Sequence, residues 1–599
     1  MPTSSHNYAI QFRKNVSDKY IIYNSLFAAL PYSGVANVGA LLPILLQTCE
    51  EGFSKDKSPI EIVDYFFKQH TYVESEQEKI DHLFKYVQYM ERQVVLFDAI
   101  EDAAFTSVNE IDGIGSLKAL IRDAEFLDNT DALKKKLEKF KVRLVLTAHP
   151  TQFYPANVLG IIHDMGEAIG KNDFNTINQY IQQLGLTPFF NKKQPTPTDE
   201  ALTLMWYLEN IFYHSIGNIY SSIVRDVFDN QYDGENPFIE LGFWPGGDRD
   251  GNPFVNGETT LNVAKALRSS IIVCYYRDIR KLKRKLTFSG VDVLVNELEA
   301  SLYENVFRPD EAKPITANEI IDCLTKIKNI IIEGNYSLYL SRLESLMHKV
   351  KLFGTHFASL DIRQDSRIHH AVLIDVHQTL LQQNGKGILP KNYNELTSDD
   401  QIGILAKLEG QLNPADFKET MTKDTLESIY AITTVQKMNG IAGCHRYIIS
   451  NCQSAMNVME LYALCRLCGW DTHLSNLDIV PLFETIEDLT NAEQIMSILY
   501  NNPLYKIHLQ HRQAQQPIML GFSDGTKDGG YLQANWSIYK AKETLTKISR
   551  ANSIVVKFFD GRGGPPSRGG GKTHQFYASM GDQIENEEIQ LTVQGQTIT

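Results

Sequence analysis

The sequence predicts a mainly helical protein with an α/β core, namely an eight-stranded parallel β/α barrel of the TIM type surrounded by many extra helices. Two observations carry this prediction. Eight short apolar runs alternate with helical segments, and almost every run has polar residues at its C-terminal end. Parallel barrels carry their chemistry at that end of their strands. Alternation alone would also fit an open doubly wound sheet, but the count of eight favours a closed barrel.

The chain begins with a helical region. Residues 58–140 follow a helical period, and within residues 74–104 one face carries several apolar side chains: Ile80, Leu83, Val87, Met90, Val94 and Phe97. We interpret this region as scaffold. We expect residues 1–140 to form an N-terminal helical region and residues 141–599 to form the barrel with large helical insertions, the whole as one continuous structural unit.

The expected strands cover residues 143–150, 238–244, 355–361, 444–450, 477–483, 517–522, 553–559 and 588–593. Between them we expect long helices with solvated charged faces at residues 198–229, 259–284, 291–305 and 317–351.

Composition narrows the class of protein. The formal charge of −14 over 599 residues argues against a general nucleic-acid or anionic-membrane partner, but it permits an anionic substrate in a locally basic cleft. Seven cysteines, an odd number, suggest reduced thiols and a cytoplasmic protein. A zinc site at Cys465 and Cys468 is less favoured than buried helix cysteines. No secretory signal opens the chain, and the apolar residues 25–49 are broken by prolines and glycines, which indicates buried helices and not a membrane span.

The most informative stretch is residues 553–574. An apolar run stops at Asp560, and a loop follows with six glycines and the cations Arg562, Arg568 and Lys572. Glycine lets backbone N–H groups approach a ligand, and arginine forks match phosphate or carboxylate oxygens, so we predict a site for a small, multiply charged anion. A solvated glycine-rich hairpin is the less favoured alternative. A nucleotide P-loop is excluded because Pro566 stands where that motif needs glycine.

Other strand ends carry a matching set of residues. His149 can move a proton near neutral pH, although a lone histidine is usually structural. Glu484 and Asp524 each follow a strand, and two hard carboxylates facing one cavity suit Mg²⁺ or Mn²⁺. The alternative for either carboxylate alone is capping of the next helix.

Four arginines complete the set and can neutralise an oxyanion-rich substrate: Arg249, Arg363, Arg562 and Arg568. Lys527 adds a mobile cation beside Asp524. Together these residues suit phosphoryl or carboxyl chemistry on a small anion. Nothing in the sequence resembles a serine or cysteine triad or a dinucleotide fingerprint.

Six segments also carry a resemblance, in order along the chain: residues 145–152 (VLTAHPTQ), 246–253 (GGDRDGNP), 360–365 (LDIRQD), 481–485 (PLFET), 521–528 (GFSDGTKD), and 561–564 (GRGG) with 568–570 (RGG). They resemble the phosphoenolpyruvate carboxylase family over about residues 145–570. Each motif alone is moderately specific, whereas six in the family's order are strongly specific.

The resemblance implies a reaction. Bicarbonate attacks the phosphate of phosphoenolpyruvate and gives carboxyphosphate and the enolate of pyruvate. Carboxyphosphate breaks down to CO₂ and phosphate, and the enolate captures CO₂ to give oxaloacetate, which feeds the tricarboxylic acid cycle. The chain would thus be a carbon–carbon lyase that fixes carbon dioxide.

The resemblance also implies roles. His149 would be the base that deprotonates carboxyphosphate, and Lys527 matches a second active-site residue. Glu484 and Asp524 would hold the divalent metal, which also steadies the enolate.

Three arginines receive roles in the same way. Arg363 and Arg562 would hold phosphate and carboxylate groups. Arg568 lies on a mobile glycine loop, and closure of that loop would exclude water that otherwise protonates the enolate.

Two departures from the family's pattern matter. The family commonly has histidine before its Gly-Arg-Gly-Gly, whereas this chain has Asp560, so no catalytic role is carried over to that position. Family members are also substantially longer, and their remaining helical portion supplies further arginines and the allosteric aspartate or malate inhibitor site. We therefore expect exposed apolar surface at the eighth strand, poor stability and little or no activity of this chain alone.

Three hypotheses stay open. The first is a cytoplasmic, Mg²⁺- or Mn²⁺-dependent phosphoenolpyruvate carboxylase, a homotetramer in its full-length form. The second is a truncated, non-catalytic fragment that binds metal and anion without turnover. The third, another barrel enzyme acting on enol phosphates, is weak beside six ordered motifs.

Overall fold

The computed structural model describes residues 3–32, 38–109, 111–147, 156–189, 196–232, 234–564 and 573–593. The chain divides into two compact units, residues 1–122 with 151–194, and residues 123–150 with 195–598. The helices of residues 156–186 thus group with the N-terminal helices, although they follow the first strand in the sequence. The expected boundary at residue 140 remains a prediction.

The first unit is entirely helical in the residues described. Its helices are α1 (Thr3–Phe12), the π-helical η1 (Arg13–Ser17), α2 (Asp18–Ala28), α3 (Val38–Phe53), α4 (Pro59–His70), α5 (Glu76–Val108), α8 (Ala156–Gly170) and α9 (Phe174–Leu186), and α6 (Leu117–Phe126) spans the boundary. Ser58 and Ser75 cap α4 and α5 by accepting backbone N–H groups. The core of this unit includes Tyr86, Tyr89 and Leu96 of α5, whereas Ile80 and Val87 of the same helix are exposed.

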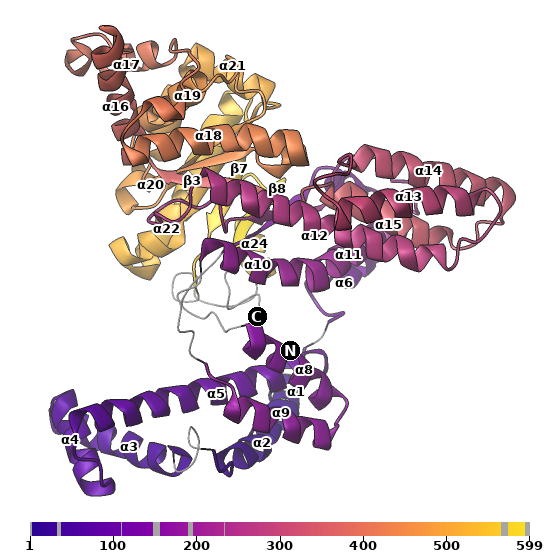
Figure 1. Cartoon of the computed structure of the whole chain (residues 1–599), viewed down its shortest axis with the longest axis vertical. Helices are drawn as coiled ribbons and strands as arrows, with labels where there is room; N and C mark the ends of the chain where they lie inside the picture. Colours follow the sequence, from indigo (N-terminus) through magenta and orange to yellow (C-terminus); the bar gives the residue numbers. More distant parts are fainter. Residues whose placement is uncertain are drawn as a thin grey trace. The chain divides into compact units, whose positions relative to one another are not determined.

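The second unit contains the predicted barrel. In the described residues eight parallel strands close in the order β1-β2-β3-β4-β5-β6-β7-β8, of which β3, β7 and β8 are labelled in Figure 1. They are β1 (Lys141–Leu146), β2 (Ile239–Phe243), β3 (Ser359–Asp365), β4 (Arg446–Ser450), β5 (Asp478–Phe483), β6 (Gln515–Gly521), β7 (Val555–Gly561) and β8 (Glu588–Val593). The barrel is closed because β1 pairs with both β2 and β8. Leu144 of β1, for example, is opposite Leu241 of β2 and Leu591 of β8. The fold class predicted from the sequence is confirmed.

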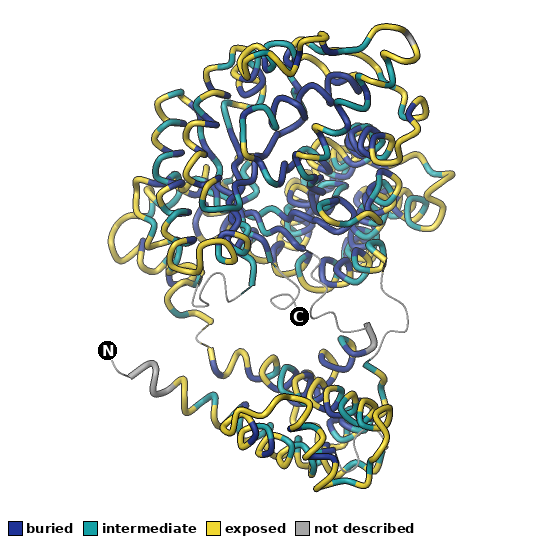
Figure 2. The backbone as a smooth tube through the Cα atoms, turned by 90° about the vertical axis from the view of Figure 1, so that its left-hand side faces the viewer, coloured by how far each residue is buried: buried dark blue, intermediate teal, exposed yellow. Residues whose placement is uncertain are grey.

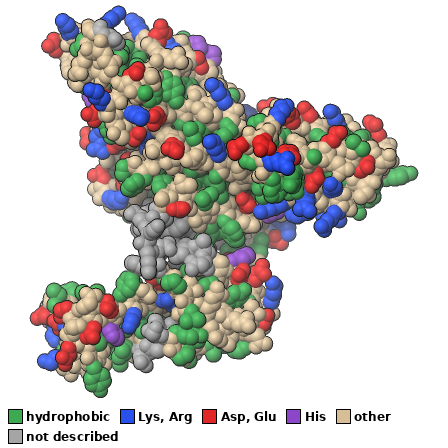
Figure 3. Space-filling model, in the orientation of Figure 1, with side chains coloured by type: hydrophobic (Ala, Val, Ile, Leu, Met, Phe, Trp, Pro, Cys, Tyr) green, Lys and Arg blue, Asp and Glu red, His purple; other side chains and the backbone are tan. Residues whose placement is uncertain are grey.

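Helices connect and cover these strands. They are α7 (Thr130–Leu137), α10 (Pro197–Tyr207), η3 (Leu208–Phe212), α11 (Tyr213–Asp226), α12 (Gly257–Lys283), α13 (Val291–Phe307), α14 (Ala317–Gly334), α15 (Leu340–Phe353), α16 (Ser366–Asn384), η4 (Tyr393–Glu395), α17 (Ser398–Leu405), η5 (Pro414–Asp416), α18 (Thr420–Asn439), η6 (Ile441–Gly443), α19 (Ala455–Leu467), α20 (Ile486–Asn501), α21 (Pro503–His511), α22 (Phe522–Ala551) and α24 (Thr573–Ala578). Acidic and basic side chains are interspersed over the region of α13–α15 (Figure 3), as expected for solvated helix faces.

Several predicted elements differ from the structure by two or more residues in their bounds, and for two of them the backbone gives the reason. The third strand begins at Ser359 and not at residue 355, because Phe357 has a left-handed φ of +61° that interrupts extended backbone. The single helix expected at 317–351 is two helices, α14 and α15, because Tyr336 and Tyr339 between them have positive φ.

Inside the barrel the side chains form layers. The middle layer is apolar and includes Val145, Trp244, Ile448, Val480, Leu482, Met519 and Phe559. Within the unit that contains the barrel, the buried stretches of the chain lie mainly towards its middle (Figure 2). A filled interior means that a ligand can bind only at an end of the barrel.

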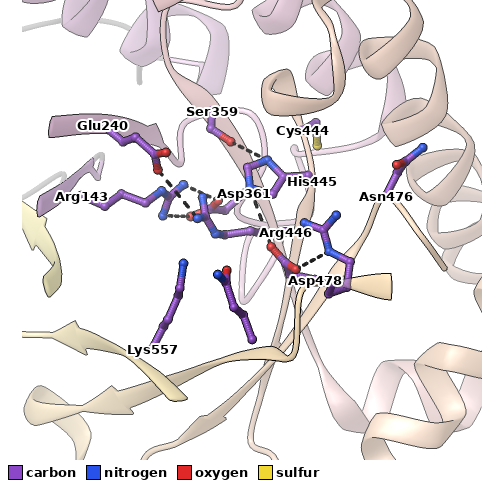
Figure 4. Close-up of polar contacts among 12 residues, drawn as sticks. Arg143, Glu240, Ser359, Asp361, Cys444, His445, Arg446, Asn476, Asp478 and Lys557 are labelled. Carbon is purple, nitrogen blue, oxygen red and sulfur yellow. Dashed lines mark hydrogen bonds and ion pairs between the residues drawn. The ribbon is translucent and has the colours of Figure 1, made fainter. Parts of the chain in front are cut away.

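The layer at the N-terminal ends of the strands is charged. Arg143 and Asp361 form an ion pair at 2.7 Å, and Arg446 Nη2 lies 3.9 Å from Glu240 Oε2 (Figure 4). Conversely, the C-terminal ends of the strands are left to carry chemistry.

All seven cysteines are free thiols, and Cys444, Cys452, Cys465 and Cys468 are buried, which confirms the preference for buried cysteines. Among the described residues, no helix is both long enough and apolar enough to cross a membrane.

Candidate active site

The loop after β2 is fastened to the end of β3. Gly247 permits this close approach, because a Cβ atom there would lie 2.1 Å from the carbonyl oxygen of Asp361. Arg363 N–H donates to Gly247 O at 3.0 Å, and Arg249 N–H donates to Arg363 O at 2.9 Å. The glycines of residues 246–253 therefore bring Asp248 and Asp250 beside Arg363.

Arg363 is held between these two carboxylates. Its Nη2 lies 2.5 Å from Asp250 Oδ2, its Nε lies 3.4 Å from Asp248 Oδ1, and its guanidinium packs over the ring of Trp244. Burial opposes the charge of Arg363, but Asp248, Asp250 and Glu484 outweigh burial and raise its pKa above the usual value. The result is a fixed cation at the rim. The sequence analysis did not single out Asp248 and Asp250, although both flank Arg249 in the motif of residues 246–253.

Glu484 follows β5 at the same rim. Burial raises the pKa of Glu484 to about 7, and the nearby carboxylates of Asp524 and Asp250 add to this shift against the N–H group of Asn451 and the charge of Arg363. Gly521, at the end of β6, allows the backbone to pass close to Glu484, since a Cβ atom at residue 521 would lie 3.2 Å from Glu484 Cα.

Asp524 lies in the first turn of α22, directly after β6. Its Oδ1 accepts from Lys527 Nζ at 2.8 Å, and both side chains are exposed. The structure therefore brings Arg363, Glu484, Asp524 and Lys527 into one region, at the ends of β3, β5 and β6.

Two neighbouring carboxylates that repel each other are suitable ligands for a hard divalent cation. Among the described residues, no group of three or more His, Cys, Asp or Glu side chains could hold a metal ion. Mg²⁺ is usually bound by one or two carboxylates and keeps several waters, and Glu484 with Asp524 would fit that ligand set.

Arg562 lies just beyond β7 and is packed beneath α24. Its backbone N–H donates to Thr592 Oγ1 at 3.1 Å, and its Nη1 donates to Thr573 Oγ1 at 3.1 Å. The guanidinium also packs 4.9 Å from the ring centroid of Phe576. Asp560, two residues earlier, pairs with Lys542 of α22.

The side chain of Arg249 does not contact Arg363, Glu484 or Asp524 in the contacts of the described residues. Its Nε donates to Val255 O at 3.1 Å, and burial lowers its pKa. It lines a cavity of about 710 Å³ together with Arg367 and Asp424. Its role in substrate binding remains a prediction.

His149 and Arg568, together with Lys572, lie outside the described residues. Their proposed roles remain predictions. The described residues nevertheless place cations and carboxylates together at the C-terminal rim, which defines a β/α-barrel protein with a charged rim.

Comparison with known proteins narrows this class. The model of the phosphoenolpyruvate carboxylase family matches residues 66–313 and 296–599. The chain belongs to the phosphoenolpyruvate carboxylase family.

Three curated relatives named phosphoenolpyruvate carboxylase illustrate the similarity. The protein of Gloeobacter violaceus is 28% identical over 540 residues, that of Paraburkholderia xenovorans 27% over 526, and that of Nitrosomonas eutropha 28% over 535. These alignments cover 78%, 76% and 78% of this chain but 57%, 52% and 56% of the relatives. The chain therefore spans a little over half the length of the relatives that it matches.

Proposed function

We propose that this chain is a phosphoenolpyruvate carboxylase, or the barrel-bearing portion of one. The reaction forms a P–O bond between bicarbonate and the phosphorus of phosphoenolpyruvate and breaks the bond to the enol oxygen. Carboxyphosphate then releases CO₂ and phosphate, and the enolate carbon attacks CO₂ to give oxaloacetate. The observation that supports this proposal most is the convergence of Arg363, Glu484 and Asp524 at one rim in a chain of this family.

Each residue has a physical task. Arg363, already held as a cation by Asp248 and Asp250, would bind oxygens of the phosphate or carboxylate group. Arg562 would bind the other anionic group, and Arg249 and Arg568 would contribute charge around it.

Glu484 and Asp524 would hold Mg²⁺ or Mn²⁺, since two carboxylates suit a hard cation that keeps open positions. When bound, this ion supplies Lewis-acid stabilisation of negative charge on substrate oxygens. Lys527, whose Nζ donates to Asp524, would add a positive charge beside them.

His149 would take the proton of carboxyphosphate. The loop that carries Arg568 would exclude water from the enolate. We also propose a cytoplasmic homo-oligomer, a tetramer in the full-length form, that takes phosphoenolpyruvate and bicarbonate and has no nucleic-acid or membrane partner.

The test is bicarbonate-dependent formation of oxaloacetate from phosphoenolpyruvate with Mg²⁺, coupled to malate dehydrogenase. Activity that is lost in His149→Asn supports the proposal. Turnover that does not need bicarbonate contradicts it.

A further inference from the structure

The end of β7 carries a buried ion pair that the proposed reaction does not use. Lys542 Nζ of α22 lies 2.8 Å from both carboxylate oxygens of Asp560. The two side chains are only 3% and 1% exposed. Desolvation of both charges offsets much of their attraction, so the pair contributes little stability by itself. Its role must therefore be sought in the other contacts of Asp560.

Asp560 is also the attachment point of α24. Tyr577 of that helix donates its hydroxyl proton to Asp560 Oδ2 at 2.8 Å. Burial, together with the charge of Asp560 and this hydrogen bond, raises the pKa of Tyr577 well above its usual value, so the phenol keeps the proton that it donates. The carboxylate thus joins α22, β7 and α24 at one point.

The rings of α24 in turn hold Arg562. The guanidinium carbon lies 4.9 Å from the ring centroid of Phe576 and 5.9 Å from that of Tyr577. Nη1 of Arg562 donates to Thr573 Oγ1, the first residue of the same helix. A shift of Tyr577 therefore moves a surface on which Arg562 rests.

Charge explains why a lysine accompanies this carboxylate. Asp560 is two residues from Arg562, and a lone carboxylate there would cancel the field of the arginine. Lys542 neutralises Asp560, so the three groups together keep a net charge of +1. A positive field is what an anionic substrate requires.

We propose that Lys542, Asp560 and Tyr577 are positioning residues that fix the guanidinium of Arg562 for an anionic substrate. Asp560 holds Tyr577 against Arg562, and Lys542 keeps Asp560 from competing for that cation. This inference deepens the proposed function in one respect only, that Arg562 binds a substrate anion. It gives a role to Asp560, at a position where the family commonly has histidine.

The first experiment measures Arg562 directly and needs no activity. In protein labelled with ¹⁵N-arginine, the Nε–Hε signal of Arg562 is assigned by its loss in Arg562→Lys. Tyr577→Phe and Asp560→Asn are expected to speed exchange of this proton with water by about tenfold, since a group held in place by contacts exchanges from rare open states, and about 1.4 kcal/mol corresponds to that factor.

The second experiment measures the KM for phosphoenolpyruvate at saturating Mg²⁺. Tyr577→Phe and Asp560→Asn are expected to raise KM by about 10- to 100-fold, with a smaller change in kcat, because a displaced binding group loses ground-state and transition-state contacts alike. The double variant Lys542→Gln with Asp560→Asn keeps an acceptor for Tyr577 and leaves no unpaired charge. It is expected to return KM to within about threefold of the original value, since coupled groups are not additive.

Lys540→Gln is the matched control, because Lys540 lies on the same helix in an exposed pair with Glu543. It should change neither exchange nor KM. The inference is overturned if folded Tyr577→Phe leaves both the Arg562 exchange rate and KM unchanged, or if the double variant is no better than Asp560→Asn. If Asp560→Asn does not fold, Tyr577→Phe alone decides. If the unaltered protein forms no oxaloacetate, the proposed function fails, whereas the exchange measurement still decides this inference.

Discussion

Arg143 of β1 and Asp361 of β3 form an ion pair inside the barrel in which neither side chain is exposed to solvent. The pair is bidentate, with distances of 2.7 and 3.2 Å, and Trp244 Nε1 donates a third hydrogen bond to Asp361 at 3.1 Å. A charge in such a place is tolerable only while its partner is present.

Removal of one partner should therefore be costly. Asp361→Asn is expected to lower the free energy of unfolding by about 3–5 kcal/mol, since Arg143 would remain charged and buried. Urea unfolding followed by tryptophan fluorescence measures this. Lys118→Gln, which breaks an exposed ion pair with Asp112, should have no measurable effect. Equal effects of the two variants would contradict the argument.

Arg363 should be sensitive even to conservative replacement. Arg363→Lys loses the planar fork held by Asp248 and Asp250 and is expected to lower kcat/KM by about 10²- to 10³-fold. Steady-state rates of oxaloacetate formation test this. Arg367→Lys is the control, because Arg367 lies four residues away, is 78% exposed and pairs with Asp365. An equal loss of kcat/KM in both variants would show that the contacts of Arg363 with Asp248 and Asp250 do not govern the rate.

Metal binding should depend on Glu484 and Asp524. Mn²⁺ at about 100 times its Kd is expected to stabilise the unaltered protein by about 2.7 kcal/mol, and a chelator should remove that gain. Glu484→Gln and Asp524→Asn should abolish it in thermal unfolding, while Glu487→Gln, three residues further along on an exposed helix turn, should not. Saturable Mn²⁺ binding that persists in both site variants would place the ion elsewhere.

The stability of the chain should fall with pH below about 6.5 because of a buried histidine. Burial, aided by the charge of Arg249, lowers the pKa of His369 from 6.5 to about 3. The unfolded chain takes up a proton between these values and the folded chain does not, so the stability is present above pH 6.5 and is lost as pH falls towards 3, by up to about 1.4 kcal/mol per pH unit.

His369→Gln removes this proton uptake. The dependence of the free energy of unfolding on pH between 6 and 4 should then be shallower by close to one proton. An unchanged slope would mean that other groups dominate acid unfolding, among which are His348 and His356, because burial lowers the pKa of each to about 4.

Local sequence was sufficient for most of the barrel. Strands β5 and β8 match the expected residues 477–483 and 588–593 to within one residue, because a short apolar run followed by a polar turn depends on few distant contacts. The prediction from local sequence was wrong at the start of β3. Phe357 there has a left-handed φ, and no glycine or asparagine at that position indicates it.

The sequence by itself determined the fold class, the family resemblance and the chemical type of the rim, since strand count, charge and motif order are all local or additive properties. Only the tertiary structure decided which groups touch. It paired Arg363 with Asp248 and Asp250, turned Arg249 towards Val255, and joined Lys542 to Asp560 and Tyr577. Such contacts link residues far apart in the chain, and their electrostatic effects depend on distance and burial, neither of which a single sequence contains.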